Sequence, residues 1–527
     1  MDYKKGDSQE TDAMLNGHNP DGTRSSEPDG IFTACSDLSR DLSLCSDFSD
    51  VLKVHLTDIQ DGAESLRSSF ATIRTLTDRY DFGPDLKANG FRTILKVTEK
   101  YAGKLAKVLG KMENRRRRVA LFPSSYKKEL KREAGSFVFM AKALKEIASH
   151  LELFPNKVVF PETTEARRML PMMEYIDNLD NQCFFGKNFG YQVFLHPFWP
   201  KITHKDHVQI LAEEEIFWTT KDEEKLHIKP PTAHLGIRPI NVVYFSHTPR
   251  KCEVEKRSPY LVLHCHGGGF VATTSWTHEA YLVPWAQQLH CPLVSINYSL
   301  SPEAPYPRAV EEVLYTFVYI IKHPEEFGWT GEKLCATGDS AGANIFIVTC
   351  IRLIQMGFDR LPDGLLLPYG GFLFQYMPSP SRLLCSMDPL ISVDIIIRCW
   401  AAYTEHEHLI HGDDNTLLSI EESLHNIRNM NPIKNPEISP MFYNEEVLAK
   451  LPKTILSVGE MDPALDDTIE FGKKLKKSGV DVSIDFYEDL PHGYLVYSMW
   501  SRECLKASQD CVKRMREILG MPDSKSL

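Results

Sequence analysis

Leu334 to Gly342 read Leu-Cys-Ala-Thr-Gly-Asp-Ser-Ala-Gly, and this stretch decides the fold. Its first four residues form an apolar, strand-like run, and Ala343–Gln355 follow with an apolar helical pattern. A Gly-x-Ser-x-Gly sequence between a strand and a helix is typical of a sharp turn that presents its serine, Ser340, as a nucleophile. Glycines suit such a turn because its backbone is strained and crowded. A glycine-rich turn with a capping serine is the competing interpretation, and the flanking strand and helix favour the nucleophile.

A second glycine-rich stretch stands upstream, at the end of another predicted strand, and reads His266-Gly267-Gly268-Gly269-Phe270. Backbone N–H groups without side chains around them can converge on one spot. We expect the N–H groups of Gly267, Gly268 and Ala341 to hold the oxyanion of a tetrahedral intermediate, each lowering the barrier by about 3 kcal/mol. A flexible turn would explain a glycine triplet alone, but the preceding histidine and strand favour an oxyanion hole.

A carboxylate and a histidine are expected after the serine, because this arrangement orders them serine, acid, base along the chain. The predicted strand Thr454–Val458 runs into Gly-Glu-Met-Asp-Pro, which puts Asp462 on the loop beyond its end. The predicted strand Ser483–Tyr487 is followed by Asp-Leu-Pro-His-Gly, which puts His492 on the neighbouring loop. We therefore predict Asp462 as the acid and His492 as the base.

Other polar residues near these motifs are expected to be structural. Asp466 and Asp467 are rivals for the acid, but the first turn of the next helix suits them better because carboxylates there favour the helix dipole. Glu303, in the loop after a strand, and His266 are predicted to support the neighbouring catalytic loops. Asp339, beside the serine, is likewise expected to be structural.

Short apolar runs bounded by turn residues predict the strands of one sheet. They are Asn241–Phe245, Tyr260–His264, Pro292–Asn297, Lys333–Thr337, Leu365–Leu367, Lys453–Val458 and Ser483–Tyr487. Helical stretches lie between several of them, such as Gly342–Gln355 and Leu465–Lys477. Strands that alternate with helices indicate an α/β fold with a mostly parallel sheet flanked by helices. We expect the catalytic domain over residues 236–520, with 372–440 as a cap or insertion.

The N-terminal half follows a different pattern. Residues 1–55 are rich in Ser, Asp and Gly and are expected to be a disordered acidic tail. Residues 56–235 are predicted to form a helical N-terminal domain and linker, with little structure in 186–235. Apolar side chains at helical spacing predict its helices, through Phe70–Tyr80, Phe91–Tyr101 and Tyr126–Leu151.

Composition narrows the classes of function. The net charge of -11 argues against a nucleic-acid partner, which would need a basic face. No apolar run reaches the roughly 18 residues of a membrane span. No clustered metal ligands and no Gly-Lys-Ser loop are present, so no metal or organic cofactor is expected. Twelve cysteines without a Cys-x-x-Cys pair, and a polar start from Met1 to Glu10, predict a reduced, cytoplasmic protein.

With these residues in hand, the chain resembles the hormone-sensitive lipase family. The resemblance rests on motifs at His266–Val271, Tyr298–Pro307, Gly338–Gly342, Asp462-Pro463 and Pro491-His492-Gly493. Further similarity lies at Ala88–Arg92, Cys183–Gly186, Pro380–Leu384 and Met387-Asp388-Pro389. The resemblance implies an α/β-hydrolase fold with a helical N-terminal domain. It also implies a triad of Ser340, Asp462 and His492, with an oxyanion hole of Gly267, Gly268 and Ala341.

The same resemblance implies an intracellular neutral lipase. Its expected substrates are diacylglycerol, triacylglycerol, cholesteryl and retinyl esters at the surface of lipid droplets, and a homodimer is left open. Mammalian members of the family carry a long phosphorylated insertion. The corresponding segment of this chain, roughly 404–437, is short, and the sequence has no Arg-Arg-x-Ser site for a basophilic kinase. Two alternatives remain: a carboxylesterase for small soluble esters, and a lipid-droplet binding protein without turnover.

Overall fold

The computed structural model describes residues 50–75, 77–115, 119, 123–149, 202–374, 379–383, 391, 393–406 and 435–522. Most of the predicted tail, and residues 407–434 of the short insertion, lie outside the described residues. The chain divides into two compact units. The first comprises Met1–Phe70 and Lys96–Lys145, and the second Ala71–Leu95 and Glu146–Leu527.

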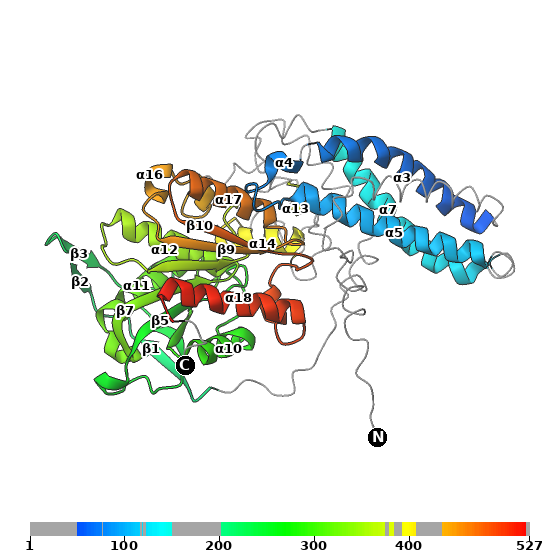
Figure 1. Ribbon diagram of the computed structural model, residues 1–527. Helices are drawn as coiled ribbons and strands as arrows, with labels where there is room; N and C mark the ends of the chain where they lie inside the picture. Colours follow the sequence, from blue (N-terminus) through cyan, green and yellow to red (C-terminus); the bar gives the residue numbers. More distant parts are fainter. Residues whose placement is uncertain are drawn as a thin grey trace, which may run out of the picture. The chain divides into compact units, whose positions relative to one another are not determined.

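The first unit is built from parts of three helices labelled in Figure 1, namely α3 (Asp50–Arg74), α5 (Gly90–Asn114) and α7 (Pro123–Ser149). Buried apolar side chains recur at helical spacing along each of them, as at Ile59, Ala63 and Leu66, at Leu105, Leu109 and Met112, and at Leu130, Phe137 and Leu144. The helices predicted through Phe91–Tyr101 and Tyr126–Leu151 are therefore confirmed as α5 and α7, whereas the one predicted through Phe70–Tyr80 is divided, because α3 ends at Arg74. However, α3 begins at Asp50, inside the stretch that was predicted to be a tail.

The second unit contains an eight-stranded sheet in the order β1-β4-β6-β5-β7-β8-β9-β10. Its strands are β1 (His204–Ile210), β4 (Ile240–Ser246), β5 (Ser258–Cys265), β6 (Leu293–Asn297), β7 (Trp329–Gly338), β8 (Gly364–Pro368), β9 (Lys453–Gly459) and β10 (Val482–Tyr487). From β6 to β10 along this order all neighbouring strands are parallel, while β4 pairs antiparallel with both β1 and β6. Every predicted strand is confirmed, and the α/β-hydrolase type of sheet with it.

Helices cover both faces of this sheet. They are α10 (Glu279–Leu289), α11 (Arg308–Lys322), α12 (Ala341–Gln355), α16 (Glu445–Leu448), α17 (Leu465–Lys477) and α18 (Arg502–Leu519). In Figure 1, α10 and α18 lie together on the near face, where their apolar side chains share one core with the strands, and α11, α12 and α17 cover the other face. Right-handed crossovers between parallel strands produce this distribution.

Short helices and 3₁₀ turns also belong to the described part of the second unit. They are α4 (Thr77–Tyr80), α13 (Pro380–Leu383) and α14 (Val393–Tyr403), with 3₁₀ turns η3 (Val254–Lys256), η4 (Pro324–Phe327), η7 (Pro440–Phe442) and η8 (Tyr494–Tyr497). α13 and α14 fall in the region predicted to be a cap. Among the described helices, none is long and apolar enough to cross a membrane.

The predicted domain boundaries need two corrections. The supposed linker contains β1, which pairs with β4, and a hairpin of β2 (Ile216–Thr219) and β3 (Lys225–Ile228), so the sheet begins before residue 236. Its polar residues hid β1, because an edge strand exposes alternate side chains to water. Residues 71–95 also belong to the compact unit of the catalytic domain, where Ala88 packs against Val458 and Leu465.

Candidate active site

Ser340 lies where β7 ends and α12 begins, and the structure brings His492 and Asp462 to it. The Ser340 hydroxyl is 2.9 Å from Nε2 of His492, and Nδ1 of His492 is 3.0 Å from both carboxylate oxygens of Asp462. Because a carboxylate only accepts, Nδ1 donates to Asp462 and Nε2 is left to accept from Ser340. His492 and Asp462 are 5% and 1% exposed, so this hydrogen-bonded line is shielded from water.

The turn that carries Ser340 is strained in the way its glycines predict. Ser340 has φ 53° and ψ -115°, and residues other than glycine rarely adopt such a positive φ. A Cβ at Gly342 would fall far inside van der Waals distance of the Cys265 carbonyl, and one at Gly338 would lie 2.6 Å from the backbone of Gly342. Only glycine fits at both positions, and the strain holds the serine above the edge of the sheet.

The loops that carry Asp462 and His492 are joined by hydrogen bonds that backbone N–H groups donate. The N–H of Met461 donates to the Leu490 carbonyl at 2.9 Å, and the N–H of Asp489 donates to the Glu460 carboxylate at 2.9 Å. Asp462 itself accepts from the N–H of Ala464 at 2.7 Å. These loops follow β9 and β10, which are neighbouring parallel strands, so their carboxyl ends meet at one edge of the sheet.

The glycine loop differs from the prediction in one donor. The N–H of Gly267 donates to Oδ1 of Asp339 at 3.1 Å and is therefore engaged. Gly268, Gly269 and Ala341 line the cavity beside Ser340, and their N–H groups have no acceptor among the residues that the structure describes. The position of Gly267 does not fit the prediction for it, whereas those of Gly268 and Ala341 do, and the N–H of Gly269 is available where that of Gly267 was expected.

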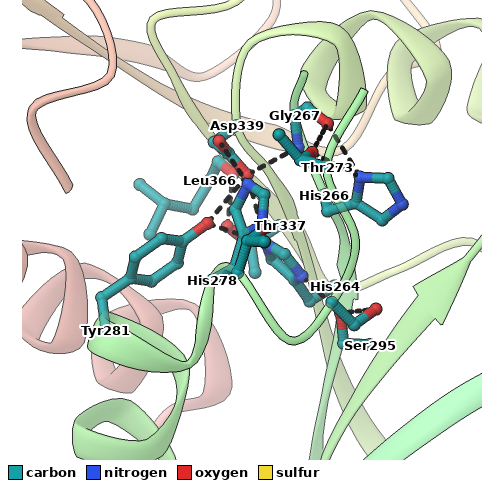
Figure 2. Close-up of polar contacts among 12 residues, drawn as sticks. His264, His266, Gly267, Thr273, His278, Tyr281, Ser295, Thr337, Asp339 and Leu366 are labelled. Carbon is teal, nitrogen blue, oxygen red and sulfur yellow. Dashed lines mark hydrogen bonds and ion pairs between the residues drawn. The ribbon is translucent and has the colours of Figure 1, made fainter. Parts of the chain in front are cut away.

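Side chains beneath the loop hold it in place (Figure 2). The Thr273 hydroxyl and Nδ1 of His266 both donate to the Gly267 carbonyl at 2.8 Å. The ring of His266 stacks on Tyr298 with centroids 4.2 Å apart, and the Tyr298 hydroxyl donates to the His266 carbonyl at 3.0 Å. Burial, with His278 nearby, lowers the pKa of His266 to about 3, so it is a neutral donor. Its position agrees with the predicted supporting role.

Asp339 is the centre of a buried polar cluster in the same view (Figure 2). Its Oδ1 accepts from the Tyr281 hydroxyl at 2.8 Å and lies 3.3 Å from Nε2 of His264, while its Oδ2 lies 3.5 Å from Nε2 of His278. Burial lowers the pKa of His278, but the Asp339 carboxylate outweighs it and the net pKa is raised. Burial raises the pKa of Asp339, yet the two imidazoles hold it well below its usual value. The centre of the cluster is therefore an ionised carboxylate, that of Asp339, beneath the glycine loop.

The structural role predicted for Glu303 belongs to another residue. Glu303 is exposed in its turn. Glu312, from α11, reaches this loop instead: the Ser299 N–H donates to it at 2.6 Å, and the buried Arg308 guanidinium lies against it at 2.6 Å. Sequence reasoning missed Glu312 because a carboxylate inside a helical pattern carries no sign of its burial.

A cavity of about 380 Å³ opens beside Ser340. Most of the side chains that line it are apolar: Phe270, Val271, Leu373, Phe374, Ile391, Ile395, Ile396, Trp400 and Val496. Arg382 and Asp467 also line it and form an ion pair at 2.5 Å. Burial raises the pKa of Asp467 to about 6 against the opposing effect of Arg382. As predicted, Asp466 and Asp467 lie in the first turn of α17.

Among the described residues, no group of three or more His, Cys, Asp or Glu side chains is arranged to hold a metal ion. The hydrogen bond between the Ser340 hydroxyl and the His492 imidazole suits proton transfer between the two groups.

A mostly parallel sheet with a serine on the strained turn from β7 to α12 is the arrangement of an α/β-hydrolase. Residues 262–496 match a family model described as an alpha/beta hydrolase fold, which confirms that class. Residues 34–204 match the model of the hormone-sensitive lipase N-terminus. Together the two matches cover most of the sequence, and the chain belongs to the hormone-sensitive lipase family, as its motifs predicted.

Several known proteins are similar to the chain. Hormone-sensitive lipase of Bos taurus is 27% identical over 479 residues, covering 58% of this chain and 63% of the relative. That of Homo sapiens is 27% identical over 467 residues, covering 56% and 43%. An esterase of Acinetobacter venetianus is 25% identical over 285 residues, covering 53% and 82%. A Pyrobaculum calidifontis esterase structure has a TM-score of 0.47 at 18% identity, covering 68% and 94%. The chain thus spans less than two thirds of the lipases it matches.

Proposed function

We propose that the chain is a serine ester hydrolase that cleaves acylglycerols, with Ser340 as nucleophile, His492 as base and Asp462 as acid. The observation that carries this proposal is the unbroken line of hydrogen bonds from the Ser340 hydroxyl through the His492 imidazole to the Asp462 carboxylate. A serine hydroxyl is a weak nucleophile unless an adjacent base takes its proton, and this line provides that base.

The reaction proceeds in two halves. Nε2 of His492 takes the hydroxyl proton as Oγ of Ser340 attacks the ester carbonyl, and Asp462 stabilises the imidazolium that forms. The oxyanion accepts hydrogen bonds from the N–H groups of Gly268, Gly269 and Ala341, each of which lowers the barrier by about 3 kcal/mol. His492 then protonates the departing alcohol. A water molecule, deprotonated by the same imidazole, releases the fatty acid from Ser340.

The lining of the cavity supports lipid esters as substrates. Apolar side chains beside Ser340 bury the acyl chain, and each methylene removed from water contributes about 0.8 kcal/mol. By its family, the chain acts on diacylglycerol and triacylglycerol, and on cholesteryl and retinyl esters. We place it in the cytoplasm, peripherally on lipid droplets, and include a homodimer in the proposal.

The test compares the wild type with Ser340→Ala on emulsified diolein and on p-nitrophenyl butyrate. We expect the wild type to hydrolyse both and to be labelled at Ser340 by a fluorophosphonate probe. The variant should lose activity and labelling while keeping its far-UV circular dichroism and melting temperature. A folded variant with wild-type turnover would reject Ser340 as nucleophile. A wild type that neither labels nor turns over would favour a lipid-droplet binding protein instead.

A carboxylesterase for small soluble esters is the second candidate. The observation in its favour is the volume of the cavity, about 380 Å³, which is at the small end of ligand sites. The ratio of kcat/KM for diolein to that for p-nitrophenyl butyrate separates the two functions. A lipase gains rate when its substrate forms an emulsion, whereas a carboxylesterase does not.

A further inference from the structure

One buried carboxylate joins three segments that are far apart in the sequence. Oδ1 of Asp466 accepts the N–H of Gly90 at 2.7 Å, and Oδ2 accepts the N–H of Ser381 at 2.8 Å. Asp466 is 1% exposed, so neither hydrogen bond is replaced by water. It therefore connects the start of α5, the start of α13 and the first turn of α17, all within the second compact unit.

Two of these segments, the start of α5 and the start of α13, also hold the loop that carries Asp462. The Thr93 hydroxyl donates to the Glu460 carbonyl at 3.3 Å, and the Ser381 hydroxyl donates to the Pro463 carbonyl at 3.1 Å. These two carbonyls belong to the residues that bracket Met461 and Asp462. The backbone on both sides of Asp462 is therefore attached to residues from other parts of the chain.

The contact at Gly90 is too close for a side chain. A Cβ there would fall far inside van der Waals distance of Asp466 Oδ2 and the Ser381 N–H, and 2.8 Å from Cβ of Pro380. The backbone of α5 thus lies directly on the carboxylate.

The segment before Gly90 is itself braced. The Asn89 amide donates to the Thr77 carbonyl at 2.9 Å and to the Asp81 carboxylate at 2.7 Å. Arg92 donates to the same carboxylate at 2.7 Å. Ala88 is buried against Val458 of β9. Because residues 88–93 are held by these hydrogen bonds, they can restrain the loop of Asp462. A segment without such contacts would move together with the loop.

We propose that Asp466 is a positioning residue, which seats the Asp462 loop by binding Gly90 and Ser381 at once. This inference rests on the proposed function, because positioning the loop of Asp462 affects the rate only if Asp462 is the acid of the triad. The carboxylate touches no substrate and acts only through the loop. Its consequence is that residues 88–93, although far from Asp462 in the sequence, help to set how well His492 is oriented.

The test uses the full chain with Asp466→Asn, Gly90→Ala, Ser381→Ala and the double variant of Gly90 and Asp466. Asp466→Asn keeps the shape of the side chain but turns one acceptor oxygen into a donor that faces an N–H. We expect a fall of about tenfold to a hundredfold in kcat per fluorophosphonate-titrated site, with KM for p-nitrophenyl butyrate changed by less than about twofold. Gly90→Ala should show the same signature from the other side, and the double variant should be no slower than the slower single variant. Ser381→Ala, which removes only a hydroxyl, should lose less.

Asp485→Asn is the matched control, since it neutralises a partly buried carboxylate on β10 that pairs with Arg514. It should keep the wild-type kcat per titrated site. A folded Asp466→Asn with wild-type kcat per titrated site, or single effects that multiply in the double variant, would overturn the positioning role while leaving the proposed function intact. If Gly90→Ala does not fold, Ser381→Ala decides, and a kcat unchanged in it and in Asp466→Asn rejects the inference. A wild type that the probe does not label would reject the proposed function and this inference together.

Discussion

Asp339 accepts the backbone N–H of Gly267 at 3.1 Å, so the residue beside Ser340 holds the first glycine of the neighbouring loop. This hydrogen bond turns Gly267 away from the cavity and leaves Gly268 and Gly269 to face it. The two glycine-rich motifs are therefore one structural unit. The geometry of the proposed oxyanion hole depends on an ionised side chain beneath it.

Asp339→Asn should lower kcat about tenfold, because the loop loses the charge that holds it and the oxyanion donors shift. KM for p-nitrophenyl butyrate should change little, since the acyl cavity stays intact. Steady-state kinetics normalised to titrated Ser340 measures both parameters.

Asp363→Asn provides the control, since that carboxylate also accepts a backbone N–H, from Leu334 at 2.9 Å, in the middle of β7. It should leave kcat unchanged. An Asp339→Asn enzyme as fast as the control would contradict the link between the two motifs.

His278→Gln should change how stability depends on pH. The pKa of His278 is raised above the ordinary 6.5 in the folded chain, so proton binding favours the folded state. This contribution is fully present below pH 6.5 and is lost as the pH rises through the folded pKa. The wild type should therefore exceed the variant in free energy of unfolding most strongly at pH 5.5, and the gap should narrow by pH 9. Urea denaturation at both pH values measures it, and a gap that widens with pH would contradict the charged pair.

Asp462→Asn should lower kcat by about four orders of magnitude with little loss of stability, because an amide cannot keep His492 in the required tautomer. The side chain is buried and nearly isosteric, so the melting temperature should stay close to that of the wild type. Stopped assays on p-nitrophenyl butyrate at high enzyme concentration measure the residual rate. A variant with more than about a tenth of the wild-type kcat would indicate another acid.

Trp400→Ala should shift the preference of the enzyme toward longer acyl chains. The indole lines the cavity, and its ring lies over the Arg382 guanidinium at 5.5 Å from centroid to Cζ. Without the indole, a short acyl chain loses apolar contacts, at a cost of about 0.8 kcal/mol for each methylene that becomes exposed to water. The space that the indole leaves can accommodate a longer acyl chain. The ratio of kcat/KM for p-nitrophenyl decanoate to that for butyrate should rise severalfold. Trp500→Ala, at an exposed tryptophan that does not line the cavity, should leave the ratio unchanged.

Local sequence predicted the strands and the hydrogen-bonded line well, because both depend on short-range rules. A strained turn needs glycines on both sides of Ser340, and those glycines stand in the sequence as a motif. Loops at the ends of parallel strands meet at one edge of the sheet, so Asp462 and His492 could be assigned from their places after β9 and β10. The edge strand β1 escaped prediction because alternate side chains along it are exposed and polar.

The sequence by itself determined the sheet and the strained turn at Ser340, since both follow from side-chain periodicity or from steric demands between near neighbours. The family was indicated by the resemblance of the motifs along the chain. Only the tertiary structure decided that Gly267 faces Asp339, that Glu312 supports the loop for which Glu303 was expected, and that Asp466 binds Gly90. Those choices rest on hydrogen bonds between buried groups far apart in the chain. Which acceptor meets which N–H is set by how whole segments pack, and no local pattern of residues carries that information.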